Sequence, residues 1–257
     1  MSPDPSRGRS KRAAAQQRLA AKRAAEAAAR AAARRRQRTV VGAVVAAVLL
    51  VVAVVVVIAV QTSRTSTSAS AAVPPNTVDG GTVVVVGSAD APVTVDLYED
   101  FQCPNCKAFE DAAGSTLAQL VAAGTVQVHH HGMAFLDTHA NDNYSTRALN
   151  AAAVVVGAAG TDAFQTFSDL LFANQPDESG SGLTDDQLIA YAAQAGAGGA
   201  EVEQQIRDLH YGDWVTTVTD QASKNGVTGT PTVLVDGTTL DDLSAAGLTA
   251  AVTAAQR

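Results

Sequence analysis

The sequence predicts an α/β domain that follows a single membrane-spanning helix. Segments typical of strands and helices alternate over 76–257 in the order β-β-α-β, a helical block, then β-β-α. An apolar run ends at residue 60, and the charge changes sign across it. Residues 1–38 carry 12 Lys and Arg against two acids, a net charge of +10, whereas 61–257 carry 6 against 23, a net charge of −17. With 47% hydrophobic residues among 257, a wholly disordered chain is excluded.

The apolar run predicts a transmembrane helix over 39–60. Every residue from Val40 to Val60 is Val, Ala, Leu, Ile or Gly, and at about 1.5 Å per residue the run spans roughly 31 Å, the thickness of a bilayer core. Four arginines directly precede the run, so the positive-inside rule places residues 1–38 in the cytoplasm and the rest of the chain outside. We therefore expect a single-pass cell-membrane protein with a cytoplasmic N-terminus.

A cleavable signal peptide is the alternative to this anchor, with Ala69-Ser70-Ala71 as its cleavage site. Its charged and apolar regions would both exceed the usual lengths, which favours an uncleaved anchor. The basic arm, residues 1–38, has Lys and Arg on all sides of its expected helix. It could contact anionic lipid or nucleic acid, but we interpret it as a solvated topology signal and expect no nucleic-acid partner. Residues 61–75 are rich in Ser, Thr and Ala and predict a flexible linker.

The first half of the domain predicts three strands and one helix. The strands are expected at Val83–Val86, Val93–Tyr98 and Thr125–His131, where β-branched residues recur. Between the last two, apolar residues at three- and four-residue steps predict an amphipathic helix over Cys103–Ala123, with a weak point at Gly114.

The second half predicts a helical insertion over about 139–225, followed by a hairpin and a last helix. Helices are expected over Tyr144–Val156, from Thr161, from Thr184 and over 201–225. Thr184 and Gln187 form a capping-box pattern, and Trp214 is expected in the core of this block. Strands over Thr232–Val235 and Thr238–Leu240 flank Asp236-Gly237, a strong hairpin signal, and Asp241 or Asp242 is the expected cap of the last helix.

Both cysteines of the chain lie in one motif, Cys103-Pro104-Asn105-Cys106, at the start of the first predicted helix. Proline is tolerated at this position because its missing N–H would be unpaired in any case. Free N–H groups and the helix dipole favour a thiolate at Cys103, while Cys106 lies one turn inside and is more buried. A reactive thiol with a second thiol behind it is what dithiol exchange requires.

The cysteine pair could instead belong to a metal site, and three consecutive histidines, His129 to His131, with His139 nearby, could supply further ligands. Consecutive strand residues alternate faces, so at most His129 and His131 can converge, and His130 points away. Because the cluster matches no regular metal spacing, we expect no metal site and interpret it as a polar strand end near the active-site rim.

Two segments resemble one known family. The active-site region of DsbA-like thioredoxin-fold proteins resembles the segment from Tyr98 to Lys107, YEDFQCPNCK, with Phe109-Glu110 behind it. The cis-proline loop of the same family resembles the segment from Gly229 to Gly237, GTPTVLVDG. The resemblance is strongest to the membrane-anchored members of actinobacteria. The resemblance covers about 76–257 and implies a thioredoxin fold with an inserted helical block.

The resemblance also implies roles for individual residues. Cys103 and Cys106 are expected to form a redox-active disulfide, with Pro104 and Asn105 between them. In the family the loop proline is cis and its neighbouring backbone accepts the substrate chain as an added strand, so a cis Pro231 is expected as a further catalytic residue, with Thr230 beside the dithiol.

The implied activity is that of an extracytoplasmic thiol:disulfide oxidoreductase without a cofactor, most of all an oxidase of secreted or cell-envelope proteins. A reductase or isomerase, or a non-catalytic metal-binding module that uses the cysteine pair, is the alternative. Reduced client proteins and a membrane quinone-linked reoxidase of the DsbB or vitamin-K-epoxide-reductase type are the implied partners.

The sequence departs from the family in two ways. Many relatives carry a buried acid where this chain has Leu97, so the proton of Cys106 must be carried by Glu99, Asp100 or water. Asn105 stands where the best-known oxidant has a histidine, and it cannot carry a charge. A less extreme pKa of Cys103 is therefore expected.

Overall fold

The computed structural model describes residues 71–257. The predicted arm, transmembrane helix and most of the predicted linker lie outside these residues. Within 71–257, no helix combines the length and the apolar character needed to cross a membrane.

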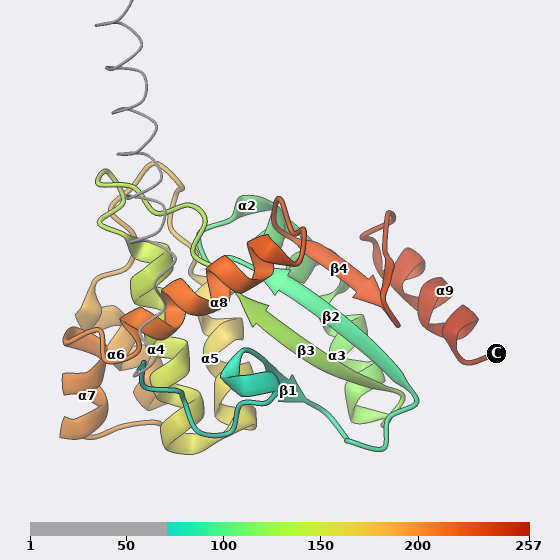
Figure 1. Cartoon of the computed structure of the whole chain (residues 1–257), viewed down its shortest axis with the longest axis horizontal. Coiled ribbons are helices and arrows are strands. Elements are labelled where there is room, and N and C mark those ends of the chain that lie inside the picture. Colours follow the sequence, from blue (N-terminus) through green and yellow to red (C-terminus); the bar gives the residue numbers. More distant parts are fainter. Residues whose placement is uncertain (1–70) are drawn as a thin grey trace, which may run out of the picture. The chain divides into compact units, whose positions relative to one another are not determined.

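A five-stranded sheet forms the centre of the described domain (Figure 1). Its strands lie in the order β1-β3-β2-β4-β5; only β2 and β3 run parallel. Their bounds are β1 Val84–Val86, β2 Val93–Glu99, β3 Val126–Gly132, β4 Thr232–Val235 and β5 Thr238–Thr239. The expected strand order along the chain is confirmed. The predicted hairpin is also confirmed, since Asp236 and Gly237 both have positive φ, at 46° and 76°.

The predicted helix after β2 is divided into three segments. Helix α2 covers Pro104–Phe109, a π-helical segment covers Glu110–Gly114, and α3 covers Ser115–Ala122. The backbone stays helical through both junctions, so the weak point expected at Gly114 appears as a π-helical segment rather than a break. Phe109 and Leu117 pack with Leu97 of the sheet and with Leu248 of the last helix, α9 Ala245–Ala255.

The predicted cap of α9 is wrong. Neither Asp241 nor Asp242 caps the helix, because α9 begins only at Ala245 and Ser244 is its N-cap, with the Ser244 hydroxyl accepting from the Gly247 N–H at 3.1 Å. Asp242 instead accepts a hydrogen bond from the Ser244 N–H, also at 3.1 Å, and so shapes the turn that leads into the helix.

Five helices follow β3 and form the predicted insertion. They are α4 Tyr144–Ala159, α5 Thr161–Ala173, α6 Asp185–Gln194, α7 Ala200–Arg207 and α8 Gly212–Lys224. The capping box of Thr184 is confirmed, and Trp214 is buried as expected. The segment predicted as one helix over 201–225 is two helices, because the chain turns at Leu209, where φ is 49°. Figure 1 shows α4 to α7 grouped on one side of the sheet and α9 on the other, beyond β4.

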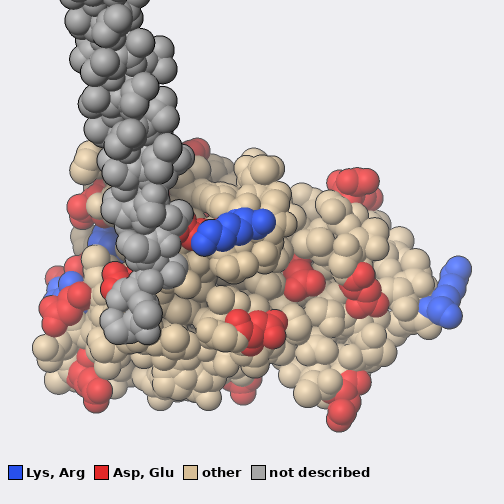
Figure 2. All heavy atoms as spheres, viewed as in Figure 1, with Lys and Arg blue, Asp and Glu red and all other residues tan. Residues whose placement is uncertain are grey.

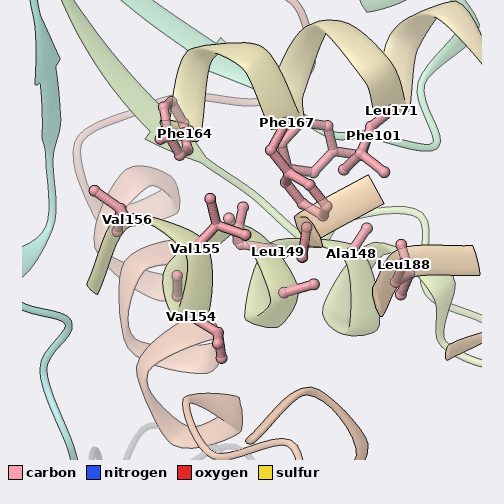
Figure 3. Close-up of a cluster of buried hydrophobic side chains, with 14 of the residues drawn as sticks. Phe101, Ala148, Leu149, Val154, Val155, Val156, Phe164, Phe167, Leu171 and Leu188 are labelled. Atoms are coloured by element: carbon pink, nitrogen blue, oxygen red, sulfur yellow. The ribbon is translucent and has the colours of Figure 1, made fainter. Parts of the chain in front are cut away.

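The segment that carries the cysteines is anchored in the core of this helical block. Phe101, two residues before Cys103, is 6% exposed, and its ring lies 5.3 Å from that of Phe172. Figure 3 shows Phe101 beside Phe167 and Leu171 of α5. The position of the cysteine loop is therefore coupled to the packing of the insertion.

The charged side chains on the surface are mainly acidic. Figure 2 shows acidic side chains scattered over the face that it draws, with few Lys and Arg among them. This distribution follows from the excess of acids beyond residue 60.

Candidate active site

Cys103 lies at the junction of the β2 loop and α2. Its backbone is extended, with φ −73° and ψ 118°, and it is the N-cap residue of the helix, with Pro104 at the first helical position. The Cys103 carbonyl accepts the first helical hydrogen bonds, from the N–H groups of Cys106 at 3.1 Å and Lys107 at 3.2 Å. The dithiol therefore lies at the positive end of a helix, as the sequence predicts.

The loop before β4 lies against Cys103, although the two segments are far apart in the sequence. The Thr230–Pro231 peptide bond is cis, which confirms that expectation. The Cys103 thiol donates a hydrogen bond to the Thr230 carbonyl at 3.3 Å. A cleft of about 560 Å³ opens beside this contact and is lined by Cys103, Pro104, Asn105, Phe135, Leu136, Glu178, Thr228, Gly229 and Thr230.

The two cysteines are free thiols with opposite electrostatic surroundings. A hydrogen bond from the Cys106 thiol, with further hydrogen bonds from Thr230 and from backbone N–H groups, lowers the pKa of Cys103 to about 5. Burial raises the pKa of Cys106 far above its ordinary value, and the neighbouring Cys103 and Glu99 raise it further. Cys103 is less exposed than we expected, at 5%, but it lines the cleft, whereas Cys106 is 0% exposed. Of the two thiols, only Cys103 can be reached from the cleft.

A buried carboxyl group lies behind the dithiol at the end of β2. Glu99 is 8% exposed, and its Oε1 has no hydrogen-bond partner within the described part of the chain. Burial raises the pKa of Glu99 well above its ordinary value, and the nearby charges of Glu110 and Cys103 add to the shift. Glu110, in the π-helical segment, also has a raised pKa because of burial and the charge of Asp169. Burial therefore favours the neutral form of the Glu99 carboxyl group beside the thiols.

The next residue, Asp100, has a different environment. Its carboxylate accepts hydrogen bonds from the Ser145 hydroxyl at 2.7 Å and from the backbone N–H groups of Gln102 at 2.8 Å, Phe135 at 2.8 Å and Leu136 at 3.1 Å. Burial nevertheless raises the pKa of Asp100 to about 6. Asp100 joins the cysteine loop to the segment after β3 and to α4, which is a structural role.

Sequence reasoning missed a glutamine that fixes the cysteine loop. The Gln175 side chain, just beyond α5, donates to the carbonyls of Phe101 and Cys103, both at 3.0 Å. No sequence signal marks Gln175, because its partners are backbone carbonyls more than 70 positions away. The insertion therefore contributes directly to the geometry of the dithiol.

The histidines do not join the cysteines. His129 and His131 lie with Asp96 on one face of the sheet, within 4.8 Å between ligand atoms, and no cysteine belongs to this group in the region 71–257. His130 points to the other face, as predicted, and is 7% exposed. A mixed cysteine–histidine metal site is therefore not formed by the described residues.

Comparisons with known proteins agree with this geometry. The family model described as thioredoxin matches residues 79–254. The chain is similar to the reduced disulfide bond oxidoreductase DsbG of Mycobacterium tuberculosis, at 32% identity and a TM-score of 0.61, covering 68% of this chain and 88% of that one. It is also similar to oxidised DsbA of the same organism, at 33% identity and a TM-score of 0.60, covering 67% of this chain and 91% of that one.

The curated relatives differ in how much of their own length the chain matches. The match to serine/threonine-protein kinase PknE of Mycobacterium tuberculosis is 34% identical over 43% of this chain, but it spans only 20% of the kinase. The match to the probable disulfide bond formation protein D of Bacillus cereus is 29% identical over 59% of this chain and 69% of that protein. The chain belongs to the thioredoxin family, and it is similar to the DsbA- and DsbG-type thiol-disulfide oxidoreductases of actinobacteria.

Proposed function

We propose that this chain is a thiol:disulfide oxidoreductase that forms disulfides in secreted or cell-envelope proteins. The observation that carries the proposal is the pairing of a low-pKa thiol at a helix N-terminus, Cys103, with a buried high-pKa thiol one turn behind it. A thiol with a pKa of about 5 is a good leaving group, which favours transfer of a disulfide from the protein to a client. The similarity to the probable disulfide bond formation protein D of Bacillus cereus supports the same direction.

The proposed reaction begins with a Cys103–Cys106 disulfide. A client thiolate attacks the Cys103 sulfur, the intramolecular S–S bond breaks, and Cys106 leaves and takes up a proton. A second client thiolate then attacks the client sulfur of the mixed disulfide, so that Cys103 leaves as a thiolate and the client is oxidised. The two electrons remain on the Cys103–Cys106 dithiol until a reoxidase removes them.

We propose that Glu99 donates the proton that Cys106 takes up when the disulfide opens. This buried acid takes the role that Leu97 cannot fill, because burial raises its pKa and because an ionised Glu99 would raise the pKa of Cys106, so that loss of the proton from one group disfavours its loss from the other. Glu110 connects Glu99 to a cavity of about 450 Å³ that Glu110, His130 and Asp169 help to line. A proton can thus pass between the thiol and solvent without crossing the client-binding cleft.

The cleft beside Thr230 is the proposed client site. The Thr230 carbonyl and cis Pro231 lie next to Cys103, where a client backbone can pair in an extended conformation. Pro104 and Asn105 line the same cleft and would contact residues beside the client cysteine.

The proposed location is the outer side of the cell membrane. Residues 39–60 would anchor the chain there, with the basic arm 1–38 in the cytoplasm. An anchored catalyst would meet a quinone-linked membrane reoxidase of the DsbB or vitamin-K-epoxide-reductase type at a high effective concentration. No cofactor is required, because the dithiol itself carries the electrons.

Oxidative refolding tests the direction of exchange. The oxidised full chain should refold a reduced substrate whose native form contains disulfides. Two thiols should appear on the full chain for each disulfide formed in the substrate, and Cys103→Ser should abolish the reaction. Equilibration with a glutathione series should give a potential nearer about −120 mV, as in DsbA, than about −270 mV, as in thioredoxin. A thioredoxin-like potential with rapid insulin reduction would instead identify a reductase.

A further inference from the structure

Three ligand-type side chains converge on the face of the sheet opposite Glu99. His129 and His131 lie two positions apart on β3, so their side chains share a face, and Asp96 pairs with His129 in the register of the adjacent strand β2. The Asp96 Oδ1 atom is 2.9 Å from His131 Nε2 and 3.6 Å from His129 Nδ1. One carboxylate oxygen therefore faces two imidazole nitrogens.

The spacing of these atoms fits a tetrahedral zinc ion. Zinc binds imidazole nitrogen and carboxylate oxygen at about 2.0–2.2 Å, which places neighbouring ligand atoms roughly 3.4 Å apart. The distances from Asp96 Oδ1 to the two imidazole nitrogens, 2.9 and 3.6 Å, differ from this spacing by a few tenths of an ångström, and all three ligand atoms lie within 4.8 Å of one another. Small side-chain rotations would centre the three atoms on one ion.

Neighbouring side chains hold both imidazoles in this orientation. The other nitrogen of His129, Nε2, lies 3.4 Å from Gln127 Oε1, an acceptor that would fix the tautomer with Nδ1 free for the metal. The His131 ring stacks on Tyr98 with centroids 4.1 Å apart and an interplanar angle of 11°. The three ligand side chains keep 17–26% of their surface exposed, so an ion can enter from solvent.

We propose that Asp96, His129 and His131 form a zinc site with three protein ligands and one open position. The site is separate from the dithiol, and thiol exchange uses none of its residues. Ion binding would bridge β2 and β3 and would stabilise the folded chain through its preference for the native state.

The test is zinc binding by the oxidised full chain, purified in detergent, because the disulfide keeps both cysteines from acting as ligands. Competition with a chromophoric chelator should give one zinc per chain. Asp96→Asn and His131→Ala should each weaken binding at least tenfold, and Gln127→Ala should weaken it about tenfold through His129. His139→Ala, at an exposed histidine outside the cluster, is the matched control and should bind as the wild type does.

Each contrary result overturns the site. Absence of binding by the oxidised wild type would identify the cluster as a hydrogen-bonded network only. Binding that survives Asp96→Asn and His131→Ala, or that appears only in the reduced chain and is lost in Cys103→Ser, would place zinc elsewhere. Unfolding curves of both variants should match the wild type without zinc, and both should retain disulfide exchange, which distinguishes this proposal from the proposed function.

Discussion

The two faces of the β2–β3 strand pair carry the same residue types in different surroundings. On one face, Glu99 and His130 are both buried, with Glu99 Oε2 3.9 Å from His130 Nδ1. On the other face, Asp96 meets His129 and His131 at partly exposed positions. Both groups come from alternate residues of the same two strands, so sequence composition alone does not distinguish them.

Burial determines what each face can do. It raises the pKa of Glu99 and lowers the pKa of His130 to about 4, so burial favours the neutral form of both groups over an ion pair. A neutral buried acid can exchange a proton with Cys106. The opposite face is open to solvent and suits a cation instead.

Replacing the buried acid should have the largest effect. Glu99→Gln keeps the side-chain shape but removes the exchangeable proton, so single-turnover oxidation of a dithiol peptide should slow on the order of 100-fold. Stopped-flow mixing of the oxidised variant with the peptide measures this rate. Glu203→Gln is the control, because that carboxylate is exposed on α7, away from the proposed proton route. Equal rates for Glu99→Gln and the wild type would remove Glu99 from the proton route.

The adjacent acid should affect stability rather than proton transfer. Asp100→Asn replaces one acceptor oxygen by an N–H₂ group and leaves buried donors unpaired, so we expect a loss of about 2–4 kcal/mol in the free energy of unfolding. Urea unfolding at pH 7.5 measures it, and Asp90→Asn, at an exposed site, should show no loss. A stable Asp100→Asn variant would contradict the role of Asp100 as the anchor of the cysteine loop.

A third expected effect is a change in the pH dependence of stability. Burial depresses the pKa of His130 from 6.5 to about 4, so between these values the unfolded chain binds a proton that the folded chain does not. Stability should therefore rise with pH across this window, by about 1.4 kcal/mol per pH unit from this group. His130→Leu should remove that part of the slope, whereas His139→Leu should retain it. An unchanged slope in His130→Leu would show that His130 is charged in the folded chain.

Local patterns predict the elements and the cysteine site well. The alternation around β2, the position of Cys103 before Pro104 and the Asp236-Gly237 turn depend on nearby residues, so the sequence is sufficient for them. The same holds for the opposite orientations of His130 and its two neighbours. The cap of α9 is missed because the four residues before the helix contain three side chains that can accept a backbone hydrogen bond, those of Asp241, Asp242 and Ser244.

A single sequence does not predict which side chains from different helices and strands come together. Asp96 meets His129 only because β2 and β3 pair in parallel with one particular register. Glu99 at the end of β2 and Glu110 in the π-helical segment act on each other through the packing of the helix on the sheet, and no local pattern predicts the π-helical segment. Gln175 reaches the cysteine loop through the packing of α5, which depends on the whole insertion.

The reactivity of each thiol as a function of pH tests the different roles of Cys103 and Cys106. The reduced full chain is treated with iodoacetamide between pH 4 and 8, and the labelled cysteine is identified by peptide mass. Cys103 should react with a half-maximal rate near pH 5, and Cys106 should stay unlabelled throughout. Cys106→Ser should also trap mixed disulfides with clients, because the resolving thiol is absent. Equal labelling of both cysteines, or trapping by Cys103→Ser instead, would contradict the assignment of Cys103 as the thiol that exchanges with clients.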